Sequence, residues 1–305
     1  MTSITMNDAQ ASEMAEAAAK PVPAAVVAAP KVEVEKIARP LVSEALAEKL
    51  RAAMKRVLPP VLGLLFCGLV WHVATLNGGG IPGPLKTWDA AVALFSDPFY
   101  RNGPNDQGIG WNVLSSLQRV AIGFGLAALV GIPAGFILGR FTFMADMINP
   151  LISLLRPVSP LAWLPIGLLV FQKADPAATW TIFICSIWPM IINTAVGVQR
   201  VPQDYLNVAR VLALSEWKVV TKILFPAVLP YMLTGIRLSI STAWLVIVAA
   251  EMLTGGVGIG FWVWDEWNNL KVEHIIIAIF VIGIVGLLLE QALILIARRF
   301  SYDHT

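Results

Sequence analysis

The side chains in this sequence that could do chemistry are ionisable or small polar residues set inside long apolar stretches. Arg156 is the clearest of them, because Pro157 and Pro160 interrupt the apolar run around it. An ionisable residue surrounded by apolar sequence is costly to bury, so it is a functional candidate by default. Arg156 could attract an anion, or it could form an ion pair with Glu251, which lies near the end of another apolar stretch.

Small polar residues in the same stretches are further candidates. Ser159, Asn193 and Thr242 could donate hydrogen bonds to a polar solute. Residues of this kind often bond to their own helix backbone instead, so a purely local role stays open for each of them.

Other ionisable residues lie near the ends of apolar stretches. Glu251 and Thr254 could gate the mouth of a pathway or contact a docked protein, and a carboxylate is a poor ligand for an anion. Arg119 and Arg237 could simply extend to a membrane surface, with their methylene groups against apolar neighbours. Glu290 faces the same choice, or it could pair with a neighbouring helix.

Several kinds of chemistry have no support in the sequence. No segment matches the nucleotide-binding pattern G-x-x-x-x-G-K-[ST], and the glycine-rich run 255–260 contains no Lys and opens no βαβ helix, so we interpret it as a flexible turn. The three histidines are scattered, and Cys67 and Cys185 lie in apolar stretches as expected of free, packed thiols. No basic patch is interleaved with aromatic residues. We therefore expect no metal, no bound cofactor, no enzymatic activity and no nucleic-acid binding.

The composition indicates a membrane protein. The 305 residues are 57% hydrophobic and 14% charged, whereas soluble domains contain about a quarter charged residues. An apolar helix of about 20 residues crosses the hydrocarbon core. We predict an all-α integral membrane protein with five to six transmembrane helices, the lower number applying if the first is peripheral. The predicted spans are residues 57–76, 112–139, 146–171, 178–198, 227–253 and 274–297.

The chain divides into four predicted parts. Residues 1–41 have the composition of a disordered cytoplasmic tail. Residues 42–56 form an amphipathic helix, either at the membrane surface or as a solvated linker. Residues 57–299 form one transmembrane domain, and 300–305 a short tail. Lys and Arg are distributed so that both termini are predicted to be cytoplasmic.

Two spans have unusual features. The prolines in the span 146–171 exclude one straight helix, and irregular backbone at membrane depth is tolerated only where protein covers it or where it lines a water-filled path. In the span 112–139, Gly131, Gly135 and Gly139 form a ridge of small residues against which another helix could pack closely. A short helix at 86–96 is expected in an outside loop.

The polar loop 199–226 lies between two apolar spans and is too long for a simple turn. Its basic residues place it on the cytoplasmic side. The run Asn207-Val208-Ala209, then Ala213, and then Ile223-Leu224-Phe225-Pro226 resembles the EAA loop of ABC importer permeases. In that pattern Asn207 occupies the Glu position and Ala213 the Gly position.

Three longer segments extend the likeness. LRPVSPLAWLPIGLLVF (155–171), SIWPMIINTAVGVQRVPQDYLNVARVL (186–212) and IVAAEMLTGGVGIGFWVWDEWN (247–268) are similar to the nitrate-importer permease branch. That branch stands beside the bicarbonate, cyanate and sulfonate or taurine permeases. The likeness covers about residues 50–300.

The resemblance implies a permease subunit of a bacterial inner-membrane importer of the binding-protein-dependent type. It also implies a cytoplasmic ABC ATPase dimer that uses the ATP, a periplasmic or lipid-anchored binding protein, and a second permease subunit, the same chain or a relative. Nitrate or nitrite is the first expected solute, moved by alternating access, with bicarbonate, cyanate or a sulfonate as alternatives. The residues expected to couple to the ATPase are Asn207, Val208, Ala209, Ala213, Trp217, Ile223, Phe225 and Pro226.

The same resemblance assigns an apolar docking face to Val208, Leu212, Leu214 and Trp217. The ionisable and small polar residues of the spans are the candidates for the rest of such a permease: Arg156, Ser159, Asn193 and Thr242 for the solute path, and Glu251 and Thr254 for the outer gate. Two rival interpretations stay open. A secondary transporter driven by an ion gradient would show broken helices in both halves of the chain, and a membrane scaffold would use the polar loop only to bind a partner.

Overall fold

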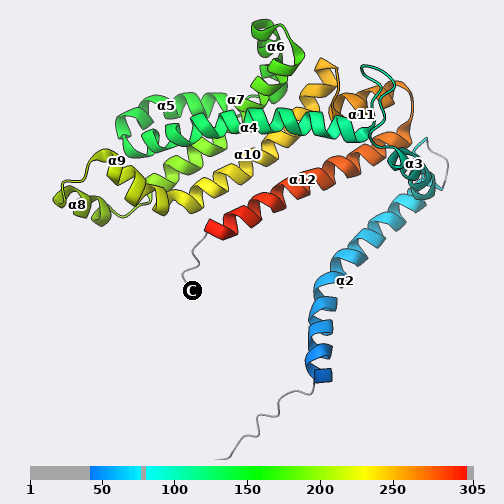
Figure 1. Cartoon of the computed structure of the whole chain (residues 1–305), viewed down its shortest axis with the longest axis horizontal. Helices are drawn as coiled ribbons and strands as arrows, with labels where there is room; N and C mark the ends of the chain where they lie inside the picture. Colours follow the sequence, from blue (N-terminus) through cyan, green and yellow to red (C-terminus); the bar gives the residue numbers. More distant parts are fainter. Residues whose placement is uncertain (1–41, 77–79, 301–305) are drawn as a thin grey trace, which may run out of the picture. The chain divides into compact units, whose positions relative to one another are not determined.

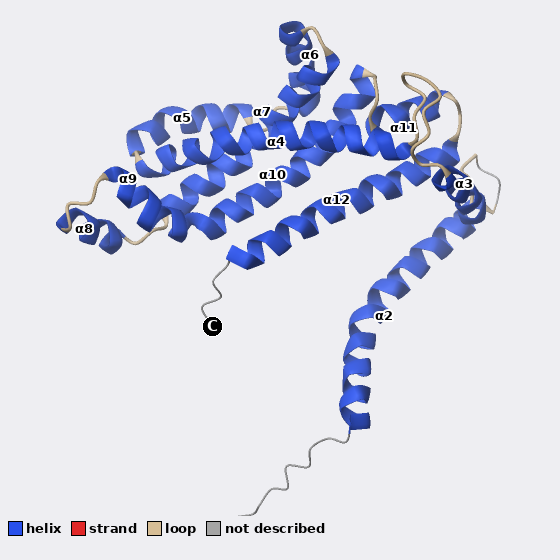
Figure 2. Ribbon diagram, viewed as in Figure 1, coloured by secondary structure: helices blue, strands red, loops and turns tan. Residues whose placement is uncertain are grey.

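The computed structural model describes residues 42–76 and 80–300, and their regular structure is helical (Figures 1 and 2). The only β pairing within these residues is an isolated bridge between Arg101 and Gln107. The predicted tail at 1–41 and residues 301–305 of the predicted C-terminal tail lie outside the described residues. The prediction of an all-α protein is confirmed.

The first described helix, α2, runs without a break over Val42–Thr75. Pro59 and Pro60 lie inside it, although each lacks the N–H that would bond to the preceding turn. The structure therefore joins the helix predicted at 42–56 to the first predicted span, and Met54–Thr75 is long and apolar enough to cross a membrane.

Four more helical runs have the length and composition of a span. They are α4 (Ile109–Arg140), α7 (Ala174–Gln199), the run Glu216–Thr254 that contains α10 (Phe225–Thr254), and α12 (Val272–Phe300). The third predicted span is instead a bent pair, α5 (Thr142–Leu155) and α6 (Pro160–Phe171), at 101° to one another. The count of five to six spans is thus confirmed, and so is the prediction that the prolines of the third span exclude one straight helix.

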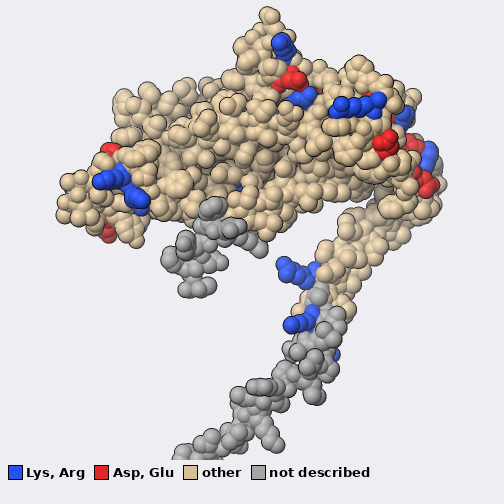
Figure 3. Space-filling model, viewed as in Figure 1, with Lys and Arg blue, Asp and Glu red and all other residues tan. Residues whose placement is uncertain are grey.

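Short helices lie at both ends of the long ones (Figure 1). At one end are α3 (Pro84–Ser96) and α11 (Ile259–Asn268). At the other end are α8 (Gln203–Val211), α9 (Glu216–Val219) and a π-helical turn, η1 (Val220–Leu224). On the face drawn in Figure 3, charged side chains gather over these two ends and beside α6, with a largely uncharged surface between them.

The helix α7 is the centre of the bundle, packed between α4 and α10. In its most apolar window 61% of residues are buried, against 28% for α4 and 11% for α12. Gly131, Gly135 and Gly139 of α4 all face α7, and a Cβ atom at Gly135 would overlap the side chain of Thr194. The predicted glycine ridge is confirmed, and its partner is α7.

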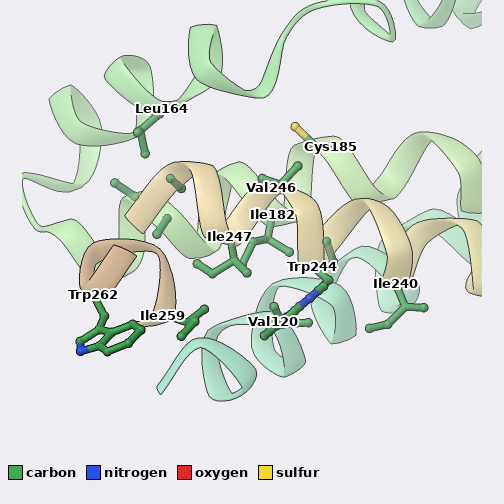
Figure 4. Close-up of a cluster of buried hydrophobic side chains, with 14 of the residues drawn as sticks. Val120, Leu164, Ile182, Cys185, Ile240, Trp244, Val246, Ile247, Ile259 and Trp262 are labelled. Carbon is green, nitrogen blue, oxygen red and sulfur yellow. The ribbon is translucent and has the colours of Figure 1, made fainter. Parts of the chain in front are cut away.

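The largest apolar core lies toward the end of the bundle that carries α11 (Figure 4). Ile182 from α7, Val246 and Ile247 from α10, and Val120 from α4 meet there, with Ile259 from α11. This packing fixes the end of α10 and the turn that follows it, and so positions the polar residues described next.

Candidate functional site

An open groove of about 540 Å³ runs between the end of α5, the middle of α7 and the middle of α10. It brings together Arg156, Asn193 and Thr242, three of the four residues predicted for a solute path. Arg156 is placed there by the break between α5 and α6, because it is the residue that ends α5. The remaining wall is mostly apolar and is formed by Cys185, Trp188, Pro189, Ile192, Leu238, Ser241 and Leu245.

The polar groups of this groove differ in what they can offer a solute. The hydroxyl of Thr242 donates to the carbonyl of Leu238 at 2.9 Å, one turn back in α10. One amide N–H of Asn193 is likewise engaged, with the Pro189 carbonyl at 2.8 Å. Arg156 is exposed and has no ion-pair partner among the described residues. Arg156 is therefore the main hydrogen-bond donor and the positive charge of the groove.

Ser159 does not line the groove. It caps α6, and its hydroxyl oxygen accepts a hydrogen bond from the Leu161 N–H at 3.3 Å. A serine before Pro160 at the start of a helix has this local role because its oxygen satisfies one of the free N–H groups of the first turn.

Glu251 is fully buried, with 1% of its surface exposed, at the end of α10 near α11. Its carboxylate accepts hydrogen bonds from the Ser116 hydroxyl at 2.7 Å, from Nη1 of Arg119 at 2.6 Å and from the Gly260 N–H at 3.0 Å. A buried carboxylate is tolerated only when it is paired and hydrogen-bonded. We refer to Glu251, Ser116 and Arg119 as the buried clasp.

The clasp holds the turn after α10 against α4. Nη1 of Arg119 also donates to the Val257 carbonyl at 2.7 Å, and the Gly258 N–H donates to Oδ1 of Asn112 at 2.9 Å. The Ile259 N–H donates to Oγ of Ser116 at 2.9 Å. No side chain fits at Gly258, where a Cβ atom would overlap the Glu251 carboxylate. The run 255–260, predicted to be flexible, is thus fastened at its second half.

Arg119 extends the clasp to a third helix. Its Nε lies 2.9 Å from Oδ1 of Asp175, at the start of α7, and its Nη2 lies 2.7 Å from the same atom. One guanidinium therefore joins α4, α7, α10 and the turn after α10. A planar fork of five N–H donors is suited to this kind of multiple contact.

The clasp corrects two interpretations of the sequence. The ion pair considered between Arg156 and Glu251 is not formed, because Glu251 pairs with Arg119. Arg119 does not snorkel, since only 14% of its side chain is exposed. Arg237 pairs with Glu290 of α12, which is the helix pairing considered for that glutamate.

The other predicted gate residue, Thr254, bonds locally to the Ala250 carbonyl at 3.1 Å. Asn112 and Ser116 were not among the residues predicted from the sequence. A signal for them exists, because Asn112, Ser116 and Arg119 recur at intervals of four and three and so share one face of an otherwise apolar helix.

The segment 203–224 has a sharp reversal at Ala213. Its φ is +48°, in the left-handed region that favours glycine. The N–H groups of Ala213 and Leu214 bond to the carbonyls of Arg210 and Ala209, both at 3.0 Å, which closes α8 with a Schellman motif. In the EAA-loop pattern, the position of Ala213 is occupied by Gly. The left-handed backbone at Ala213 gives the physical reason for that preference.

Apolar side chains are exposed on this segment. Val208, Val211, Leu212 and Trp217 have 57%, 85%, 64% and 76% of their surfaces exposed. Leu214 was predicted to share this face, and that prediction is wrong. The reversal at Ala213 turns Leu214 inward, where it packs with a second buried cluster.

The other predicted coupling residues lie around the same segment. Asn207 is exposed and accepts a hydrogen bond from Arg210 at 3.1 Å, whereas Ala209 is buried. Ile223 packs against the second cluster, and Phe225 stacks on Phe136 of α4 with ring centroids 6.4 Å apart. Pro226 stands in the first turn of α10, directly after the π-helical turn η1.

Known proteins similar to this chain are found over most of its length. Residues 131–302 match the family described as the binding-protein-dependent transport system inner membrane component. The nitrate import permease protein NrtB of Synechocystis sp. is 47% identical over 237 residues, which cover 77% of this chain and 86% of that protein. NrtB of Leptolyngbya laminosa is 45% identical, covering 82% of this chain and 90% of that protein.

Proteins with another named solute are almost as similar. The bicarbonate transport system permease protein CmpB of Synechococcus elongatus is 44% identical over 248 residues, covering 80% of this chain and 89% of that protein. A solved structure of the MetNI methionine ABC transporter in an inward-facing conformation aligns with a TM-score of 0.55 and 15% identity. It covers 62% of this chain and 94% of that chain, and it supports the fold alone.

The long apolar helices and the bent pair define an integral membrane protein. The chain belongs to the family of binding-protein-dependent transport system inner membrane components, and it is an ABC importer permease.

Proposed function

We propose that this permease carries a small inorganic anion, nitrate or nitrite first, across the bacterial inner membrane by alternating access. The observation that carries the proposal is the groove in which Arg156, Asn193 and Thr242 meet. An unpaired ion is expensive to desolvate, and the exposed guanidinium of Arg156 offers a planar set of donors that suits a planar oxyanion.

Bicarbonate is the second candidate, because relatives named for it are 44–45% identical to this chain. It is also a planar monovalent oxyanion, but it carries a hydroxyl that needs an acceptor. The hydroxyl protons of Ser241 and Thr242 are donated to backbone carbonyls, so their oxygens present lone pairs to the groove. The groove thus offers suitable groups to either anion. Cyanate and sulfonates remain alternatives, but the similar proteins reported above are named for nitrate or bicarbonate.

Energy for transport comes, in this proposal, from separate ATPase subunits that dock on the segment 203–224, and this chain hydrolyses no ATP. The exposed apolar residues Val208, Leu212 and Trp217 support a docking face, and large aromatic residues commonly dominate binding energy at such faces. A binding protein on the outside delivers the anion, a second copy of the chain completes the pathway, and both termini are cytoplasmic.

The solute assignment is tested by uptake in proteoliposomes that contain all partners, ATP inside and one of nitrate, nitrite, bicarbonate, cyanate or taurine outside. Replacing Arg156 with Gln removes a charge-assisted hydrogen bond worth about 1.5–3 kcal/mol, so nitrate uptake falls roughly 10- to 100-fold. Arg156→Lys keeps the charge and loses less. Arg101→Gln, at the end of the bundle that carries α3 and α11, is the matched control and retains uptake.

Normal nitrate uptake by Arg156→Gln would remove the groove from the pathway. Preference of the wild type for bicarbonate would move the assignment to the second candidate. Uptake that persists at full rate without ATPase subunits would favour the rival secondary transporter.

Docking of the ATPase is tested separately with Trp217→Ala. The variant should lose co-purification of the ATPase subunits at unchanged expression, because 76% of the Trp217 surface is exposed and available to a partner. Trp267→Ala makes the same change in α11, at the opposite end of the bundle, and should retain the ATPase. Equal retention by both variants would contradict the assignment of the docking face.

A further inference from the structure

The helix α3 has three distinct faces. Its buried or half-buried face consists of Thr87, Ala90, Ala91 and Leu94, and the helix packs on α12. A second, exposed face is apolar and consists of Leu85, Trp88, Val92 and Phe95, with 75%, 68%, 58% and 50% of their surfaces exposed. The third, also exposed, carries Lys86, Asp89, Ala93 and Ser96. We call the second face the apolar stripe of α3.

The position of α3 along α12 sets its depth in a membrane. The span Val272–Ala297 has 26 residues and is roughly 39 Å long, so it exceeds a hydrocarbon core of about 30 Å by 4–5 Å at each end. Residues of α12 that lie beside α3 run from Ile277 to Ile284. They lie roughly 8–18 Å from the start of the helix, which is within the hydrocarbon core for a span that stands upright and centred in it.

The charges around α3 agree with this depth. Lys86 pairs with Glu273 at 2.5 Å, and Glu273 is the second residue of α12. This ion pair therefore stands at the level of the lipid headgroups, one turn before the depth of Ile277. The apolar stripe then begins where hydrocarbon begins, and the face with Asp89 and Ala93 is turned to water.

A groove of about 380 Å³ adjoins the stripe. It is lined by Trp71 of α2, by Trp88 and Phe95 of α3, and by Phe280 and Ile284 of α12. The indole N–H of Trp71 is already bonded to the Pro82 carbonyl at 3.2 Å, so the groove presents almost no polar group to an occupant. Phe280 and Ile284 are also exposed on α12, a helix with the length and composition of a membrane span.

We infer that α3 is an in-plane membrane helix, whose apolar stripe and adjoining groove are covered by acyl chains of the lipid leaflet at that end of the bundle. The sequence predicts a short helix at 86–96 in an outside loop. An amphipathic helix with Trp and Phe on one face and charge on the other is the type that lies at the boundary between headgroups and acyl chains. Trp71 and Trp88 are of the residue type that commonly anchors helices at the membrane interface.

The experiment compares two adjacent residues that point to different surroundings. Val92→Cys and Ala93→Cys are each made in a Cys67→Ala, Cys185→Ala background, spin-labelled, and reconstituted in phosphatidylethanolamine and phosphatidylglycerol vesicles. Accessibility is measured to oxygen, which concentrates in hydrocarbon, and to a water-soluble nickel chelate. Both positions are exposed, so neither label disturbs the packing of α3 on α12.

The proposal expects a label at residue 92 to collide often with oxygen and rarely with the chelate, and a label at 93 to show the reverse. Frequent collision of both labels with the chelate would place α3 in water and overturn the proposal. Poor access of both reagents to residue 92 would show that a protein, such as a binding protein or a second copy of the chain, covers the stripe. A retained size-exclusion profile and labelling of Phe95→Cys with the pattern of residue 92 guard against a locally unfolded helix.

Discussion

Replacing Glu251 with Gln removes the negative charge from the buried clasp and leaves the shape of the side chain nearly unchanged. In the wild type the carboxylate accepts from Arg119, Ser116 and the Gly260 N–H. The amide of Gln has one acceptor oxygen and two N–H donors, so one donor must face Ser116 or Gly260, which are themselves donors there. The cation of Arg119 also loses its buried partner.

The expected loss of stability follows from burial. Breaking a fully buried ion pair from one side costs about 3–5 kcal/mol. In the Glu251→Gln variant, Arg119 keeps Asp175 as a partner and is 14% exposed, whereas Glu251 is 1% exposed. We therefore expect a somewhat smaller loss of stability than for a fully buried pair, about 2–4 kcal/mol. For a domain of this size that free energy corresponds to a fall of roughly 5–15 °C in the unfolding midpoint.

The assay is thermal unfolding of purified protein at one fixed scan rate, because unfolding of such proteins is often irreversible. In a Cys67→Ala background, a thiol-reactive dye reports the exposure of Cys185, which is only 9% exposed in the wall of the groove. Glu273→Gln is the matched control. It also removes an ion-paired carboxylate, but its partner Lys86 is 72% exposed, so the expected cost is about 0–1 kcal/mol.

A double-mutant cycle decides whether the ion pair between Arg119 and Glu251 is responsible for the loss of stability. Arg119→Gln with Glu251→Gln removes both charges together, so its loss of stability should be smaller than the sum of the two single losses. Strict additivity would refute the reasoning, because it would mean that the two side chains do not interact. An unchanged midpoint for Glu251→Gln alone would refute the burial of its charge.

Two further changes test the packing and the backbone. Gly135→Ala should lower the stability of the protein by about 1–3 kcal/mol, because its Cβ would overlap Thr194 of α7. Gly125→Ala is the control in the same helix. A Cβ atom there meets no atom within 4 Å, so this variant should be neutral or stabilising in the same melting assay. Ala213→Gly should stabilise the segment 203–224 by about 0.5–1 kcal/mol. Glycine removes the cost of a left-handed alanine, and the greater chain entropy of the unfolded state offsets part of that gain. Slower hydrogen exchange at the Leu214 N–H would agree with this prediction, and faster exchange would contradict the left-handed geometry.

Composition and local pattern were sufficient for the architecture. Apolar length predicted the spans, and the prolines at 157 and 160 predicted the break that the structure has between α5 and α6. Both rest on physics that acts within one helix, namely burial in hydrocarbon and the missing N–H of proline. The glycine ridge on α4 was predictable for the same reason, although its partner α7 was not.

Pairings across the bundle could not be predicted in this way. Arg119 and Glu251 are 132 residues apart, and their contact depends on the rotation and register of α4 against α10, which no local pattern encodes. The prediction that Leu214 is exposed on the docking face was wrong for a different reason. A helical periodicity was extended through Ala213, and a left-handed residue there redirects every side chain that follows it.

The arrangement of the groove walls bears on how a force at the docking segment reaches the solute path. Glu216–Thr254 is one helical run of 39 residues, so Trp217 is joined to Thr242 by a continuous helical rod that includes the π-helical turn η1. The clasp ties the far end of that rod to α4 and α7. Arg156 stands outside it, at the end of α5 beside the 101° bend. In the proposed importer, a displacement of the rod therefore moves Thr242 relative to Arg156, which changes the groove at the one place where its positive charge lies.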